Sequence, residues 1–236
     1  MPSHPRIAIY ADGADVREMV AARDAGTVKG FTTNPTLMRK SGVSDYSAFA
    51  KEALAATGGM PISFEVFADE FDEMERQARL IATWGDAVFV KIPVTNTRGE
   101  SAVPLIRTLS AAGVKLNVTA ILTLEQVRDV VDALDAETPA IVSVFAGRIA
   151  DTGVDPVPLM REAAEICASK PRSQLLWASP RELLNIFQAE ECGCHIITVT
   201  ADILKKLSMV GKPLTDLSLD TVKMFYNDAA AAGFRL

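Results

Sequence analysis

The 236-residue sequence has few of the residues that build metal centres and disulfide frameworks, with three cysteines and two histidines. An odd, small number of cysteines argues against a disulfide framework. The segment Cys-Gly-Cys-His at 192–195 lacks a second ligand pair, so we expect His195, at the start of a strand, to be structural. His4 lies in an end that we expect to fray. We therefore predict no metal and no cofactor, and assign acid–base work to carboxylates and lysine.

Long apolar runs and a charge excess of positive sign are also absent. No run approaches the roughly 18–20 residues that a membrane span needs, and the N-terminus carries no apolar signal core with a cleavage site. The formal net charge of −6 argues against nucleic acid or an acidic membrane as the main partner. These absences predict a cytoplasmic protein that binds neither nucleic acid nor membrane.

The sequence does have a regular alternation of short apolar strands and amphipathic helical stretches, which is typical of parallel βαβ units. Strands are predicted near residues 7–11, 30–33, 61–66, 87–92, 114–119, 140–144, 174–178 and 195–199. Helical stretches include residues 15–25, 70–84, 101–112, 124–135 and 157–168. Eight such units predict an α/β fold, a single (β/α)8 TIM barrel. An open doubly wound sheet is less favoured because neither GxGxxG nor GxxxxGK[ST] occurs.

The last stretch of the chain stands outside this count. We expect residues 1–218 to form the barrel as the catalytic domain, and residues 219–236 to form an additional C-terminal helix. Its apolar face contains Val222, Phe225, Tyr226, Ala229 and Ala232. The pattern leaves two positions open, on a neighbouring subunit or as a cap on the same barrel.

One lysine stands out in the fourth predicted strand. Residues 87–94 read Ala-Val-Phe-Val-Lys-Ile-Pro-Val, an apolar run with Lys91 near its C-terminal end. Lysine is rarely buried unless it is paired or used. Burial strips the ammonium of its hydration and favours the neutral amine, a nucleophile toward carbonyl carbon. We predict a Schiff base at Lys91, and keep open the alternatives of a lysine that reaches water or only pairs with a carboxylate.

Polar residues stand at the C-terminal ends of the first seven predicted strands, where barrel enzymes place their chemistry. They are Asp12, Thr33, Asn34, Glu65, Lys91, Asn117, Thr119, Ser143 and Ser179. Glu65 and Lys91 lie inside apolar runs, where an uncompensated charge costs several kcal/mol. The cluster therefore predicts an active site, with a purely structural Glu65–Lys91 ion pair as the alternative.

Two arginines follow the later strands, Arg148 in Phe-Ala-Gly-Arg and Arg181 in Ala-Ser-Pro-Arg. Loops after the late strands of a barrel commonly bind phosphate, and the planar guanidinium suits that anion. With Ser179 the two arginines predict an oxyanion site; the alternative for each is a solvated loop charge.

With these residues in hand, the chain resembles the transaldolases, and among them the short class near fructose-6-phosphate aldolase. The matching segments are Tyr-Ala-Asp-Gly-Ala-Asp (10–15), Gly-Phe-Thr-Thr-Asn-Pro-Thr (30–36), Phe-Glu-Val (64–66), Val-Lys-Ile-Pro (90–93), Lys-Leu-Asn-Val-Thr (115–119), Ser-Val-Phe-Ala-Gly-Arg-Ile (143–149) and Ala-Ser-Pro-Arg (178–181). They follow one another in the family's order across the predicted barrel.

The resemblance implies a role for each matched residue. Lys91 matches the Schiff-base lysine, Asp12 the carboxylate that takes the proton from the hydroxyl of the cleaved bond, and Glu65 an acid–base group that acts through a water held with Thr119. Asn34, Asn117 and Ser143 match residues that bind the three-carbon unit, and Arg148, Ser179 and Arg181 match the phosphate site. Thr33 and Phe145 are also expected to bind substrate. The implied mechanism needs no metal.

Two positions bear on the subclass, since fructose-6-phosphate aldolases carry Gln where Glu65 stands and Tyr where Phe145 stands. This chain has the transaldolase pair, which favours transfer over simple cleavage. It departs from the family at Val144 and Ala146, usually Pro and Val, and at Glu182, commonly Asn. A carboxylate beside the phosphate site weakens a dianion relative to a monoanion.

Three functions therefore stay open. The resemblance implies a transaldolase acting on sugar phosphates. The first alternative is an enzyme for a related anionic ketose such as a sugar sulfonate, or a fructose-6-phosphate aldolase-type cleavage. The second is a silent sugar-phosphate-binding barrel. The resemblance also implies a homo-oligomer, a pentamer or decamer, in which the terminal helix reaches a neighbour.

Overall fold

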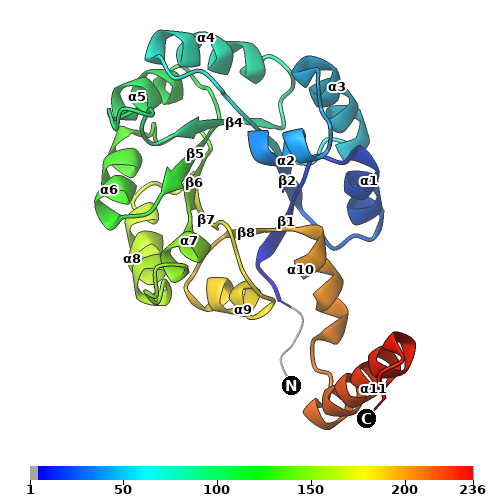
Figure 1. The fold of residues 1–236 in the computed structure, drawn as a ribbon. Coiled ribbons are helices and arrows are strands. Elements are labelled where there is room, and N and C mark those ends of the chain that lie inside the picture. Colours follow the sequence, from blue (N-terminus) through cyan, green and yellow to red (C-terminus); the bar gives the residue numbers. More distant parts are fainter. Residues whose placement is uncertain (1–4, 236) are drawn as a thin grey trace.

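Short runs rich in Val, Ile and Leu form the strands of a closed parallel barrel in the computed structural model, which describes residues 5–235 (Figure 1). His4 lies outside the described residues. Each strand pairs with its neighbours in chain order, and β8 closes on β1. The strands are β1 (Ala8–Asp12), β2 (Gly30–Thr32), β3 (Ile62–Glu65), β4 (Val88–Pro93), β5 (Leu116–Ile121), β6 (Ala140–Val144), β7 (Ser173–Trp177) and β8 (Ile196–Val199).

Helices surround the barrel, and one more helix stands apart from it at the C-terminal end of the chain (Figure 1). They are α1 (Val16–Asp24), α2 (Pro35–Lys40), α3 (Tyr46–Thr57), α4 (Phe71–Ala82), α5 (Val103–Ala111), α6 (Leu124–Ala133), α7 (Ala146–Ala150), α8 (Val157–Cys167), α9 (Leu184–Glu191), α10 (Ala201–Lys205), the 3-10 turn η1 (Lys206–Met209) and α11 (Leu214–Ala232). Side chains cap several N-termini, and Thr123 and Gln126 form a reciprocal capping box on α6. No described helix is long and apolar enough to cross a membrane.

The predicted (β/α)8 barrel is confirmed, and each predicted strand overlaps an observed one. The largest displacement is in β5, which continues to Ile121 because an irregularity shifts the register between Val118 and Ile121. Ala120 there has a φ of 61°. The short helices α2, α7 and α10, which follow strands directly, are not among the predicted stretches, since one turn is too short to show a helical period.

Two separate apolar clusters result from the alternation of side chains along the strands. The larger lies between the barrel and its helices. The smaller fills the barrel interior with Tyr10, Ile141, Leu176, Ala178 and Ile196, with Phe89 and Phe145 packed against it. Gly30 lies opposite Tyr10, where a Cβ would come within 2.6 Å of the Tyr10 ring. The polar residues that follow two positions later along these strands lie next to this apolar layer, toward the C-terminal ends of the strands.

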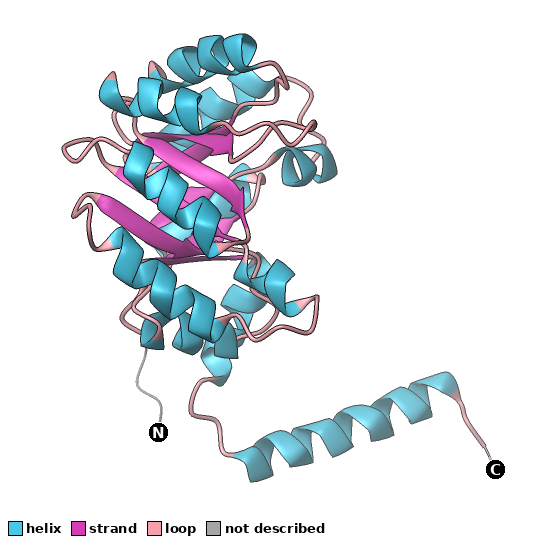
Figure 2. Ribbon diagram, turned by 90° about the vertical axis from the view of Figure 1, so that its left-hand side faces the viewer, coloured by secondary structure: helices cyan, strands magenta, loops and turns pink. Residues whose placement is uncertain are grey.

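Helix α11 extends away from the barrel (Figure 2). None of its residues is buried, and Val222, Phe225 and Tyr226 are 61%, 62% and 74% exposed. It begins at Leu214, before the predicted start at residue 219, because Pro213 with extended backbone sets its N-terminus. In this structure α11 does not pack on its own barrel, and its apolar face has no partner within the described chain. The surface that this face covers stays a prediction.

Candidate active site

A cavity of about 580 Å³ opens at the C-terminal ends of the strands. Its charged and polar lining continues the interior positions of the barrel: Asp12 follows Tyr10 by two residues, and Lys91 follows Phe89. Of the predicted site residues, the cavity is lined by Asp12, Asn34, Glu65, Lys91, Asn117, Thr119, Ser143, Phe145, Arg148, Ser179 and Arg181. The fold thus brings together residues from positions 12 to 181 of the chain.

Lys91 lines this cavity and is 7% exposed. Its Nζ lies 3.2 Å from Glu65 Oε2 and donates to the backbone carbonyl of Thr33 at 3.0 Å. The pairing follows from the register of the barrel, because Glu65 and Lys91 are directly opposite on β3 and β4. The phenol of Tyr46 donates to the Glu65 carbonyl at 2.8 Å and so fixes the end of β3. These two contacts hold the amine in one place at the cavity, which is how a reactive group is positioned for attack.

Asp12 is the last residue of β1 and lines the same cavity. Burial raises the pKa of its carboxyl, while the positive charge of Lys91 and a hydrogen bond from Thr32 lower it, and the charge of Glu65 raises it. The raised pKa leaves a carboxylate of greater basicity than an exposed aspartate. A group of this kind in a cleft is suited to take a proton from a bound hydroxyl.

Asn117 is fully buried and both ends of its amide are held. Its Nδ2 donates to Ser63 Oγ at 2.9 Å, and Ser143 Oγ donates to its Oδ1 at 2.6 Å. Thr119, two residues further along β5, has a buried hydroxyl with no hydrogen-bond partner among the described residues. A buried, unpaired hydroxyl that faces a cavity is a site for a water or a ligand hydroxyl.

The two residues after β2 are placed differently. Asn34 caps α2, since its Oδ1 accepts from the backbone N–H of Leu37 at 2.9 Å, and it lines the cavity. Thr33 does not line the cavity: its hydroxyl is buried and donates to the Ser63 carbonyl at 2.9 Å. The backbone carbonyl of Thr33 accepts the hydrogen bond from Lys91, and its neighbour Thr32 lines the cavity.

The predicted anion site lies where α7 meets the loop after β7. Ser179 has a left-handed φ of 58°, and its backbone carbonyl passes directly beside Gly147 of α7. A Cβ at Gly147 would lie 1.5 Å from Ser179 O, so only glycine permits this approach. Arg148, Ser179 and Arg181, on either side of this close contact in the chain, all line the cavity.

Arg181 is already paired in this arrangement. Its Nε donates to Asp151 Oδ1 at 2.9 Å, and its Nη2 donates to Asp151 Oδ2. This fork lowers the pKa of Asp151 and raises that of Arg181. Both side chains are about half exposed, at 47% and 50%, so the pair remains accessible to an anion. The predicted anion site thus carries less positive charge than two unpaired arginines would give.

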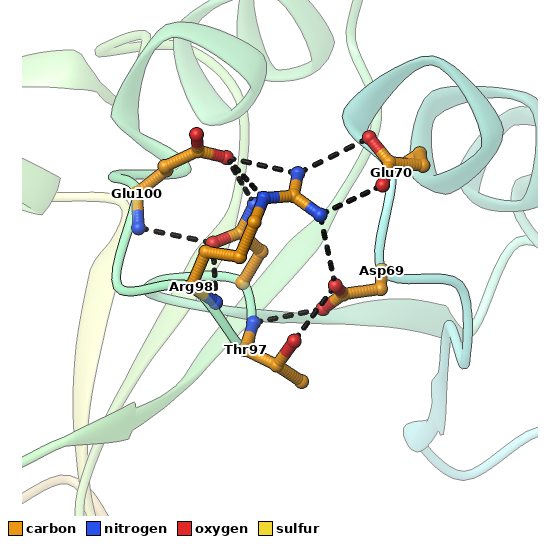
Figure 3. A network of polar contacts seen from close by, with 6 residues as sticks. Asp69, Glu70, Thr97, Arg98 and Glu100 are labelled. Atoms are coloured by element: carbon orange, nitrogen blue, oxygen red, sulfur yellow. Dashed lines mark hydrogen bonds and ion pairs between the residues drawn. The ribbon is translucent and has the colours of Figure 1, made fainter.

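The loops that follow β3 and β4 are tied together by Arg98 (Figure 3). Its guanidinium donates to Glu70 Oε1 at 2.7 Å and to Glu100 Oε2 at 2.9 Å, while the backbone N–H of Thr97 donates to Asp69 at 2.8 Å. A single exposed ion pair stabilises little, but a network across two loops restrains both. These loops are the continuations of the strands that carry Glu65 and Lys91.

Four polar residues of the cavity are not among those predicted from the sequence: Thr32, Thr36, Lys40 and Thr198. Thr32 and Thr198 occupy interior positions at the ends of β2 and β8, and strict alternation along those strands would have identified them. Lys40 stands in the last turn of α2, a helix too short to be recognised from its pattern. A second lysine therefore reaches the same cavity as Lys91.

His195 precedes β8, at the opposite end of the strand from Thr198. Its Nδ1 accepts from the backbone N–H of Leu175 at 3.1 Å, and Cys192 and Cys194 are buried. Within residues 5–235, no three histidine, cysteine, aspartate or glutamate side chains gather as metal ligands would. These contacts give His195 a structural role.

Comparison with known proteins decides the family. A family profile described as Transaldolase/Fructose-6-phosphate aldolase matches residues 9–236. The chain belongs to the transaldolase/fructose-6-phosphate aldolase family. A probable transaldolase of Dehalococcoides mccartyi is 35% identical over 209 residues, which cover 88% of this chain and 92% of the relative. A probable transaldolase of Brucella anthropi is 34% identical over 229 residues, covering 96% and 98%, and probable transaldolase 2 of Listeria monocytogenes is 33% identical over 213 residues, covering 89% and 92%.

Membership of the transaldolase/fructose-6-phosphate aldolase family confirms the resemblance drawn from the sequence and the assignment of the chain as an enzyme. The match begins at the second residue of β1 and continues through α11, so the cavity at the strand ends lies within it.

Proposed function

We propose that the protein is a transaldolase that moves a dihydroxyacetone unit from a ketose phosphate of the fructose 6-phosphate type to an aldose acceptor through a Schiff base on Lys91. The observation that carries the proposal is the buried amine of Lys91, 3.2 Å from Glu65, in a cavity of about 580 Å³ that also contains Asp12. An ionisable pair so placed is costly unless it is used.

The reaction begins when the Lys91 amine adds to the ketose carbonyl and water leaves, which forms an iminium ion. Asp12 then takes the proton of a hydroxyl group on the ketose. This hydroxyl is on the carbon of the breaking bond that leaves as part of the aldehyde. The carbon–carbon bond breaks, its electron pair moves into the iminium to give an enamine, and an aldehyde departs. Addition of the enamine to an acceptor aldehyde, return of the proton from Asp12 and hydrolysis of the iminium release the new ketose.

Glu65 and Thr119 are assigned to the proton transfers that form and hydrolyse the iminium. The unpartnered Thr119 hydroxyl supports a water at this place, because a buried hydroxyl without a partner is costly. Asn34, Asn117 and Ser143 hold the hydroxyls of the three-carbon unit. Thr33, the remaining predicted substrate residue, acts through its carbonyl on Lys91.

Retention of the three-carbon unit separates transfer from cleavage. Phe145 packs on the apolar interior and offers no hydroxyl to protonate the enamine. The enamine therefore stays bound to Lys91 until an acceptor aldehyde adds, instead of being released as free dihydroxyacetone. The discriminating assay follows fructose 6-phosphate with and without aldose phosphates: we expect a new ketose with an acceptor and little free dihydroxyacetone without one. Free dihydroxyacetone at the rate of transfer would indicate an aldolase, and ligand binding without turnover a silent barrel.

A sugar sulfonate is a second candidate substrate because Arg181 is already paired with Asp151 and is followed by Glu182. A sulfonate carries one charge and a phosphate carries up to two, so a carboxylate beside the site penalises the phosphate more.

Asp151→Asn tests this balance of charge. We expect kcat/KM for fructose 6-phosphate to rise relative to that for the sulfonated ketose by about threefold, a modest change because exposed charges are screened by solvent. Steady-state rates with both ketoses provide the measurement, and Asp132→Asn on the exposed side of α6 is the control. A ratio that falls, or changes equally in the control, would contradict a role of Asp151 in selecting the anion.

We further propose a homo-oligomer, a pentamer or decamer, in which α11 packs on a neighbouring subunit. The exposed apolar residues of α11 support this, since a single helix with such a face is stable in water only when the face is covered. An apolar groove of about 680 Å³ at Leu184, Phe187 and Met209 adds to the surface that a neighbour can cover.

Removal of α11 by ending the chain after Lys212 is expected to reduce the mass in solution to that of a monomer or smaller assembly. Light scattering of the full and shortened chains measures this directly. The substitution Phe225→Glu, which leaves the helix in place, provides the matched control for loss of the helix itself. An unchanged number of subunits in both variants would place the subunit interface elsewhere.

A further inference from the structure

Two threonine hydroxyls stand behind Asp12 and are not used in the reaction proposed above. Thr32 ends β2 and Thr198 lies in β8, the two strands that flank β1. Thr32 is 2% exposed and Thr198 is 7% exposed. Thr32 Oγ1 lies 2.7 Å from Asp12 Oδ1 and 2.6 Å from Thr198 Oγ1, so the three side chains form one continuous line of hydrogen bonds.

The chemistry of the groups fixes the direction of this line. An ionised carboxylate only accepts hydrogen bonds, so Thr32 donates its single hydroxyl proton to Asp12. Thr32 then has no proton left for Thr198, and Thr198 must be the donor between the two hydroxyls. The bond from Thr198 polarises the Thr32 hydroxyl and strengthens its bond to the carboxylate.

We propose that Thr198 and Thr32 form a hydroxyl relay, in which Thr198 donates to Thr32 and Thr32 to Asp12, that positions the carboxylate and favours its ionised form. This inference rests on the proposed function, in which Asp12 is the base. Both threonines are positioning residues, and Thr198 acts only through Thr32. Because hydroxyls rotate, the same relay can accept a hydrogen bond once Asp12 has taken its proton.

The surroundings of Asp12 leave the relay as its main uncharged support. Lys91 and Glu65 are the charged groups in the cavity that act on Asp12, with opposite signs. The strands on either side, β2 and β8, contain no charged residue. On α10, which packs on β1, Asp202 and Lys205 are exposed and lie 3.7 Å from one another. Burial raises the pKa of Asp12, and the bond from Thr32 opposes that rise.

The test compares the pH dependence of kcat/KM for the wild type, Thr32→Val, Thr198→Val and the double variant. We expect Thr32→Val to lower kcat/KM about tenfold and to move the acid limb to higher pH, because the carboxylate loses its donor. Thr198→Val should also lower kcat/KM and move the acid limb to higher pH, but by less. Thr198→Ser should restore both quantities to their wild-type values. The double variant should match Thr32→Val alone, since Thr198 acts through Thr32.

Two results would overturn the relay. The first is an acid limb of the kcat/KM profile that does not move in Thr32→Val. The second is a double variant whose kcat/KM falls below that of Thr32→Val by the same factor that Thr198→Val alone causes. The latter would mean that Thr198 contacts the substrate directly. Thr57→Val, which removes a buried hydroxyl that donates to the Leu54 carbonyl, controls for packing. Trapping of the wild type with ketose and borohydride separates the two proposals. An adduct with coincident pH profiles refutes only the relay, and no adduct refutes the function.

Discussion

Lys91→Met is expected to lower turnover by about 10³-fold or more, the scale seen when a member of a cooperating catalytic group is removed. Methionine retains the length and the packing of the lysine stem but cannot form an imine. The cavity and its anion site should persist, so the variant should still bind the substrate. The measurement combines the rate of transfer with the KM of the residual activity and ligand-induced thermal stabilisation.

The same change removes the partner of Glu65, whose side chain is 18% exposed. An unpaired carboxylate in such a place can cost up to about 3 kcal/mol of folding free energy. The double variant Lys91→Met/Glu65→Gln keeps the site neutral and separates the loss of the nucleophile from the loss of stability. Turnover within tenfold of the wild type in the folded double variant would contradict the role of Lys91.

Gly147→Ala is expected to have the second largest effect, because its Cβ would lie 1.5 Å from the backbone carbonyl of Ser179. A backbone atom cannot move aside as a flexible side chain can, so α7 or the loop after β7 must shift. Forced packing of this kind costs about 1–3 kcal/mol. We expect a lower melting temperature together with a KM for the phosphorylated ketose raised by about tenfold or more, since Ser179 and its neighbour Arg181 line the anion side of the cavity.

Gly85→Ala is the matched control, because a Cβ there meets its nearest atom, Leu54 Cδ2, at an ordinary 3.8 Å. The comparison uses thermal unfolding and steady-state kinetics on both variants. A Gly147→Ala protein with the stability and KM of the Gly85→Ala protein would show that the loop after β7 does not depend on this contact.

The barrel could be predicted from the sequence because its strands are short apolar runs with regular spacing, each bounded by polar residues. Lys91 and Glu65 could be identified for the same reason, since a charged residue inside such a run is conspicuous. Alternation along a strand indicates which side chains face the barrel interior. The sequence prediction did not apply this rule at the end of β2, and it therefore named Thr33 as a cavity residue, whereas Thr32 lines the cavity.

What could not be predicted depends on contacts between distant segments. Nothing in the local pattern around Asp151 indicates its pairing with Arg181, thirty positions later. The left-handed Ser179 and the close approach of its carbonyl to Gly147 likewise arise from the packing of two loops. The direction in which α11 leaves the barrel is not encoded in its amphipathic pattern, which alone left two possibilities.

The most direct measurement of the central claim is the site of covalent trapping. The protein is reduced with borohydride in the presence of fructose 6-phosphate, its intact mass is recorded, and the modified peptide is mapped, with Lys91→Met and Lys40→Met as paired variants. The account predicts a three-carbon adduct on Lys91 that persists in Lys40→Met and is lost in Lys91→Met. Modification of Lys40, the other lysine of the cavity, or no adduct with either the phosphorylated or the sulfonated ketose, would contradict it.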